Sequence, residues 1–173
     1  MAVVVIIIIV APMALKQYTK QFSPETTVRY SDKGYDLSVT YSAPSKKNRV
    51  IFGGLVPYDQ VWRTGANEPT MFSTNKDLKL GDGILPAGTY SIWTIPQKET
   101  WTVMFNNGDY SWGVNMDGEP QYDAAYDVVK VAVAREQLPT VVENFTIAFE
   151  AAGAGVSMLL KWDKDQVSVG FDQ

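Results

Sequence analysis

The most unusual part of the sequence is a glycine-rich stretch that mixes apolar and charged residues, Phe52-Gly53-Gly54-Leu55-Val56-Pro57-Tyr58-Asp59-Gln60-Val61-Trp62-Arg63-Thr64-Gly65-Ala66-Asn67-Glu68. Three glycines and one proline interrupt it, and it is too apolar for an ordinary surface loop. Burial of polar side chains such as Arg63, Asn67 and Glu68 is costly unless they are paired. We therefore expect this stretch to form a packed corner that closes one end of the fold.

On both sides of this corner, apolar residues alternate with polar ones, which is typical of half-buried strands. No apolar period of 3.6 residues persists for three helical turns. The pattern predicts an all-β fold, an antiparallel β-sandwich of the jelly-roll or immunoglobulin-like kind with about nine to ten strands. The expected strands are residues 26–30, 35–41, 70–74, 78–80, 89–95, 101–105, 128–134, 144–150, 156–162 and 166–171. Asn106-Asn107-Gly108 predicts a hairpin turn, and residues 121–126 a single helical turn.

The composition excludes several classes of chemistry. The 173 residues include no cysteine and no histidine, which rules out disulfides, thiol catalysis and a Ser-His triad. The net charge of −4 argues against nucleic acid as a partner. We predict no cofactor and no metal site, because the acidic pairs at residues 117–119 and 163–165 lack the ligand pattern of a calcium loop. The basic run at residues 46–49 is expected to be a solvated turn.

Residues 1–15 form a hydrophobic segment that precedes a polar linker, residues 16–25, and the globular domain, residues 26–173. Residues 2–15 carry no charge, and as a helix they would be about 21 Å long, shorter than the roughly 30 Å hydrocarbon core. Three interpretations are open: a cleaved export signal, a retained membrane anchor, or an extended strand donated to a neighbouring copy. All three place the domain outside the cytoplasm, in the periplasm or at the cell surface.

Candidate binding residues lie in the corner itself. The bend after Arg63 is expected to bring Glu68 back to it, so that the two form a half-buried ion pair. Alternatively, Arg63 is an anchor for a carboxylate, a sulfate or a sugar hydroxyl. Asn67 belongs to the same group. Glu68 is considered as a lone acid or base, although a glycosidase needs a second carboxylate at a defined distance. No catalytic residue is predicted.

Two aromatic residues in the most irregular segment, residues 106–126, are further candidates. Tyr110 and Trp112 lie there outside any expected strand, where an exposed ring would stack on a sugar or contact a partner protein. The other tryptophans lie in or beside expected strands and are assigned to the core.

The corner also resembles the signature of an uncharacterised bacterial family, the domain of unknown function 2911. The resemblance begins at Ile51-Phe52-Gly53-Gly54-Leu55-Val56-Pro57-Tyr58, includes Val61-Trp62-Arg63-Thr64-Gly65-Ala66-Asn67-Glu68, and extends over roughly residues 24–171. Among the other matching motifs are Leu85-Pro86-Ala87-Gly88-Thr89-Tyr90 and Trp112-Gly113. It implies an exported protein with no assigned activity, substrate or cofactor. Because no cysteine follows the apolar segment, the lipid anchor of some members is excluded here.

From these observations we expect a non-catalytic, extracytoplasmic β-sandwich that acts as an accessory subunit or binding module at a membrane surface. Its expected partner is a protein, either in a membrane complex or as neighbouring copies. The first alternative is a carbohydrate-binding or carbohydrate-active domain that uses Arg63, Tyr110 and Trp112 for recognition. The second is a filament subunit that assembles by donation of its N-terminal strand.

Overall fold

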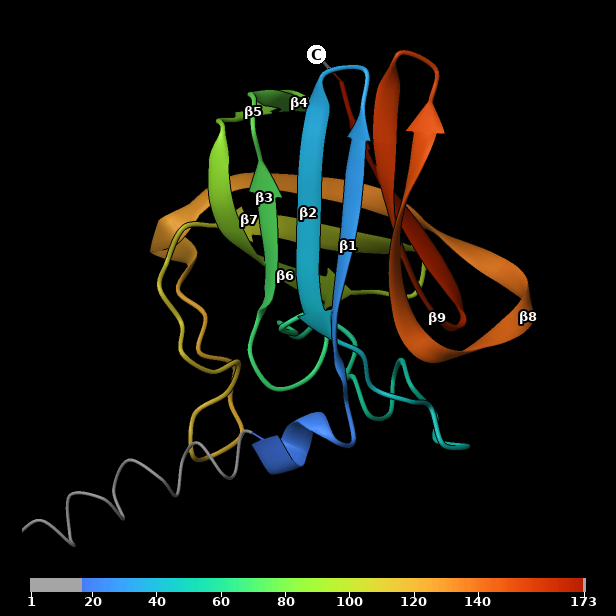
Figure 1. Cartoon of the computed structure of the whole chain (residues 1–173). Helices are drawn as coiled ribbons and strands as arrows, with labels where there is room; N and C mark the ends of the chain where they lie inside the picture. Colours follow the sequence, from blue (N-terminus) through green and yellow to red (C-terminus); the bar gives the residue numbers. More distant parts are fainter. Residues whose placement is uncertain (1–16, 173) are drawn as a thin grey trace, which may run out of the picture.

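The computed structural model describes residues 17–172 and shows an all-β protein (Figure 1). Its strands are β1 (Glu25–Asp32), β2 (Tyr35–Ser42), β3 (Thr70–Thr74), β4 (Leu78–Leu80), β5 (Gly83–Leu85), β6 (Gly88–Pro96), β7 (Thr100–Asn106), β8 (Asp127–Ala152) and β9 (Gly155–Phe171). A helical turn at residues 17–20 precedes β1, and a 3₁₀ turn, η1 (Ala124–Tyr126), precedes β8. The predicted all-β antiparallel fold is confirmed.

Seven strands form one antiparallel sheet in the order β1-β2-β3-β6-β7-β8-β9, and β4 and β5 form a separate two-stranded sheet. Apart from the β4–β5 insertion, neighbours in the sheet are also neighbours in the chain. The connectivity is therefore that of a meander, whereas immunoglobulin and jelly-roll folds use Greek-key connections.

The last two strands fold the sheet over onto itself. The first part of β8 pairs with β7, whereas its later part pairs with β9 through a register that shifts twice. This change of partner brings the β8–β9 hairpin across the face of the earlier strands, as in the two layers of a sandwich (Figure 1). The ring centroids of Tyr41 on β2 and Phe145 on β8 are 5.6 Å apart, and those of Phe72 on β3 and Phe171 on β9 are 5.3 Å apart.

The core follows the alternation of the sequence. On β2, Tyr35, Leu37, Val39 and Tyr41 are all buried, and the residues between them are exposed or half-buried. Burial of one such apolar side chain contributes about 1.5–3 kcal/mol. The inward face of β2 therefore fixes the register of the strand, because a slip by one residue would expose all four side chains.

One local prediction was wrong. The motif at residues 106–108 does not form a hairpin turn, because β7 ends at Asn106 and its partner β8 begins only at Asp127. Asn106 is instead fully buried, and its side-chain amide donates hydrogen bonds to the Asp123 carbonyl and the Asp127 carboxylate at 2.9 and 2.8 Å. Asn106 thus closes the base of a long excursion, residues 107–126.

The strand boundaries differ in three places. The expected strands left out β5, and the breaks expected within β8 and β9 lie inside continuous strands, with two register shifts on the β8 side. The hydrophobic segment, residues 1–15, lies outside the described residues. Within residues 17–172, no helix combines the length and the apolar character that crossing a membrane requires.

Candidate functional site

The connection between β2 and β3, residues 43–69, covers one end of the sandwich. We call this connection, together with residues 17–24, the loop end; it lies at the bottom of Figure 1. Its apolar side chains Ile51, Phe52, Val56 and Trp62 are buried. The Trp62 ring packs on the core aromatics, at 6.1 Å from Phe52, 5.1 Å from Phe145 and 6.0 Å from Trp162, on which it stacks. The predicted packed corner is therefore part of the core.

The backbone of the corner holds an unfavourable conformation. Thr64, a β-branched residue, has a φ of 58°, a region that such residues rarely adopt. The Thr64 side chain is fully buried and donates a hydrogen bond to the Thr94 hydroxyl at 3.2 Å, while its carbonyl accepts one from the Thr70 hydroxyl at 2.5 Å. Residues kept in rare conformations by their surroundings occur preferentially at functional sites. The residue next to Thr64 is Arg63.

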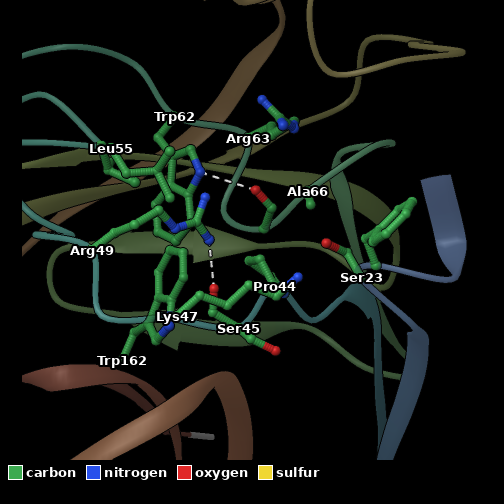
Figure 2. A pocket seen from close by; sticks show the side chains of 13 residues that line it. Ser23, Pro44, Ser45, Lys47, Arg49, Leu55, Trp62, Arg63, Ala66 and Trp162 are labelled. Atoms are coloured by element: carbon green, nitrogen blue, oxygen red, sulfur yellow. Dashed lines mark hydrogen bonds between the residues drawn. The ribbon is translucent and has the colours of Figure 1, made fainter.

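A cavity of about 330 Å³ lies beside this corner, which we call the loop-end cavity (Figure 2). Arg49, Leu55, Trp62 and Trp162 lie on one side of it and Ser23 and Ala66 on the other. The cavity is bordered by three cations, Lys47, Arg49 and Arg63, and none of the described residues that line it carries a carboxylate. An adjoining cavity of about 270 Å³ shares Leu55, Val56, Trp62 and Arg63 with it.

Arg63 is half-buried and lines both cavities. Its Nε is buried and has no hydrogen-bond partner, and no ion pair within residues 17–172 includes Arg63. Burial lowers the pKa of its guanidinium below the ordinary value, because the charged form has lost hydration. Arg63 is therefore a desolvated cation without a carboxylate partner in the described part of the chain.

The predicted ion pair between Arg63 and Glu68 was wrong. Glu68 lies 3.6 Å from the ammonium of Lys20, which comes from the helical turn before β1. It lines a different, smaller cavity of about 180 Å³. Sequence spacing alone does not show to which side a bend directs each side chain, and a residue from the linker takes the place that Arg63 was expected to fill.

Asn67 connects the corner to the excursion of residues 107–126. Its side-chain amide donates to the Ser42 hydroxyl at 3.3 Å, and its carbonyl accepts a hydrogen bond from the Gly113 amide at 3.0 Å. A side chain at Gly113 would meet the Arg63 side chain, because a Cβ built there lies 1.9 Å from Arg63 Cδ. The excursion thus packs on the aliphatic stem of Arg63, and glycine is required at the contact.

Sequence reasoning missed two cations and one aromatic residue of the site. Lys47 and Arg49 lie in an exposed turn, as expected, but they also line the loop-end cavity, which was not predicted. The Arg49 guanidinium donates to the carbonyls of Ser45 and Lys46 at 2.5 and 3.0 Å, which fixes its position (Figure 2). The basic run just before the corner is a signal that could have indicated them. No signal in the sequence indicated Trp162, which is distant in the chain from the corner.

The two aromatic candidates lie apart from the cavities. The centroid of the Tyr110 ring lies 5.2 Å from that of buried Trp93, and the Tyr110 hydroxyl donates a hydrogen bond to the side-chain Oδ1 of Asn106 at 3.0 Å. Trp112 is half-buried and directly precedes Gly113. Neither residue lines the loop-end cavity or the adjoining one. The structure therefore brings Arg63 and Asn67 together at Gly113, with Glu68 turned toward Lys20.

The described part of the chain has no cluster of three or more Asp and Glu side chains placed to hold a metal ion. The strongest perturbation of an acidic group is at Tyr122, where burial and a short hydrogen bond to the Asp127 carboxylate raise the pKa of the phenol. A phenol with a raised pKa stays protonated and donates a hydrogen bond. This group supports the excursion of residues 107–126 rather than either cavity.

Comparison with known proteins places the chain in one family. The family model described as protein of unknown function (DUF2911) matches residues 23–171, nearly the whole chain. No curated protein and no solved structure shows significant similarity to it.

Proposed function

We propose that this chain, which belongs to the DUF2911 family, is a non-catalytic, extracytoplasmic binding module that takes an anionic group of a partner at Arg63. The observation on which this proposal rests is the half-buried guanidinium of Arg63, which has no ion pair in residues 17–172. A buried charge costs several kcal/mol in lost hydration unless a counter-charge offsets it. An anion bound between the two cavities would supply that counter-charge.

The charge around Arg63 supports the same ligand class. Lys47 and Arg49 border the loop-end cavity together with Arg63, and no carboxylate in its lining neutralises them. Low-dielectric walls strengthen the field of such a group and concentrate ions of opposite charge. The planar guanidinium of arginine also suits carboxylates and phosphates, which it binds through two parallel hydrogen bonds.

A carbohydrate that carries a carboxylate is the second candidate. Phe22, which is 51% exposed, lines the loop-end cavity beside the cations, and aromatic rings are common contacts for the apolar faces of sugars. In this version of the proposal the aromatic contact with the sugar comes from the lining of the loop-end cavity. Tyr110 and Trp112, which line neither cavity, do not contact the sugar.

Thermal unfolding of the full chain in detergent tests the proposal. Sodium phosphate and sodium glucuronate are compared with sodium chloride at equal ionic strength, because a ligand that binds only the folded state raises the unfolding temperature. We expect one of the two anions to raise it in the wild type and not in Arg63→Met. Arg29→Met, which removes an exposed arginine from β1, is the matched control and should keep the rise.

The two anions separate the candidates. A rise with glucuronate alone favours the acidic carbohydrate, and a rise with phosphate favours a phosphate-bearing partner. If neither anion raises the unfolding temperature, or if Arg63→Met responds as the wild type does, Arg63 is not the anion site.

A further inference from the structure

The loop end gathers apolar side chains on the surface. Tyr18, Phe22, Val50 and Leu55 are 57%, 51%, 70% and 46% exposed. The rings of Tyr18 and Phe22 are 5.1 Å apart, and the Leu55 amide donates to the Val50 carbonyl at 3.0 Å. Phe22 and Leu55 border the same cavity, which connects the two pairs. Scattered exposed apolar residues are normal, but a group of four large ones on one surface indicates an interaction site.

Two cations that form no ion pair within residues 17–172 lie within this apolar group. The Lys47 ammonium lies 5.5 Å from the centroid of the Phe22 ring, and within the described residues the guanidinium of Arg49 donates to backbone carbonyls alone. Of the carboxylates nearby, Asp163 pairs with Lys46 at 2.7 Å, and Glu143 accepts a hydrogen bond from the Lys47 backbone amide at 2.9 Å without an ion pair to the ammonium. The chain as a whole has a net charge of −4, so this positive surface is a local feature.

The chain enters the fold at this same end. The described part begins at Gln17, next to Tyr18, and the apolar residues 2–15 immediately precede it in the sequence. Figure 1 places the helical turn of residues 17–20 at the bottom of the molecule, below β1 and β2 and far from the β4–β5 sheet at the top. Residues 2–15 therefore join the described part of the chain at the same end as the exposed apolar group.

We infer that the loop end docks on an anionic lipid bilayer, with Phe22, Val50 and Leu55 at the level of the headgroups and Lys47 and Arg49 against lipid phosphates. Interfacial proteins combine exposed apolar residues with lysine and arginine in this way. This inference rests on the proposed anion site and names its partner, because the loop-end cavity then receives the phosphate of a headgroup. An acidic protein surface would need the same cations, but it gives no reason for the apolar segment at the same end.

Fluorescent labels at single cysteines test this orientation, since the chain has no cysteine of its own. The variants Val50→Cys, Leu55→Cys and Ile84→Cys are labelled with nitrobenzoxadiazole in the full chain and reconstituted into vesicles. Ile84 is a matched control because it is 55% exposed and lies on β5, at the opposite end of the molecule. The vesicles contain phosphatidylcholine alone or phosphatidylcholine with phosphatidylglycerol.

With phosphatidylglycerol present, the labels at residues 50 and 55 should emit brighter, blue-shifted fluorescence, and the label at residue 84 should emit as in water. Because each basic residue near a charged membrane contributes about 1 kcal/mol, Lys47→Gln or Arg49→Gln should reduce the inserted fraction of the label about fivefold. Met71→Gln removes a 38% exposed apolar residue of β3 and should change nothing.

Three results would overturn the inference. Labels at 50 and 55 that stay water-like in both vesicles show that the loop end does not touch lipid. An equal shift at residue 84 shows unspecific adsorption. A shift that occurs only in native membranes, and not in pure lipid, identifies an acidic protein partner. If phosphate still raises the unfolding temperature through Arg63 in any of these cases, the anion site survives and only the lipid assignment fails.

Discussion

Arg63 and Arg135 are two half-buried arginines, each with a buried Nε that has no hydrogen-bond partner, yet their surroundings differ. Arg135, on β8, donates to the Asp165 carboxylate of β9 at 2.8 Å and to the Lys98 carbonyl at 3.1 Å. The hydrogen bond to Asp165 raises the pKa of its guanidinium. At Arg63, in the β2–β3 connection, burial lowers the pKa and no carboxylate offsets it.

This difference in pairing distinguishes an arginine that stabilises the fold from one that is available for recognition of a ligand. The Arg135–Asp165 pair joins two strands where the register of β8 and β9 is about to shift, so the fold itself uses that charge. The position of Arg63 is also fixed, by the hydrogen bonds of the neighbouring Thr64 and by the packing of Gly113 against its side chain. Its guanidinium, however, forms no ion pair within the described residues. A cation that the fold positions and does not neutralise is available to a ligand.

The largest expected effect is at the paired arginine. Arg135→Met should lower the free energy of unfolding by about 3 kcal/mol, because it leaves the buried Asp165 carboxylate without a counter-charge. Urea unfolding followed by tryptophan fluorescence measures this, with Arg29→Met as the exposed control. A loss similar to that of the control would show that the pair contributes nothing and would remove the contrast between the two arginines.

The contact that positions Arg63 should give the next largest effect. Gly113→Ala should cost about 2 kcal/mol, because the new methyl group meets Arg63 Cδ and, at 2.8 Å, the carbonyl of Asn67. Part of the cost should disappear in Arg63→Ala, which removes the contact with Arg63 Cδ and keeps those with the Asn67 carbonyl and, at 2.9 Å, with the Cβ of residue 63. Gly170→Ala is the control, since a methyl group there meets no atom within 4 Å. Equal stability of the two alanine variants would contradict the packing described for Arg63.

The smallest effect on stability is expected at Arg63 itself. Arg63→Met keeps the apolar stem and removes an unpaired, desolvated charge, so the free energy of unfolding should change by less than about 1 kcal/mol. The same urea experiment measures it. A loss as large as that of Arg135→Met would mean that the fold uses the Arg63 charge after all, and would turn the proposed binding residue into a structural one.

The sequence predicted the fold better than the site, and β2 shows why. Alternation is a local property of the chain, and the four apolar residues of β2 are buried as their spacing indicates. The breaks expected within β8 and β9 follow from turn residues that continuous strands accommodate: Asp163 of β9 has a φ of 54° and still pairs with Val142 of β8. Tertiary pairing overrides turn chemistry there, and no short window of sequence contains that information.

The site depends on contacts between distant residues. The prediction that Arg63 binds Glu68 used only their separation in the chain, whereas Glu68 pairs with Lys20. The hairpin expected at residues 106–108 failed for the same reason, since Asn106 bonds to Asp127 across the whole excursion. Arg63 and Asn67 were found from residue type, but their relation to Gly113 and to the cations of the loop-end cavity required the fold.

The most direct test of the anion site is an NMR titration of the arginine side chains. The full chain, labelled with ¹⁵N in detergent, is titrated with sodium phosphate at constant ionic strength, and the Nε–H signals are assigned by arginine-to-methionine variants. We predict that the Arg63 signal shifts and saturates, while those of Arg29 and Arg135 stay in place. An Arg63 signal that does not move, or that moves in parallel with Arg29, would contradict the claim that the fold holds this charge for an external anion.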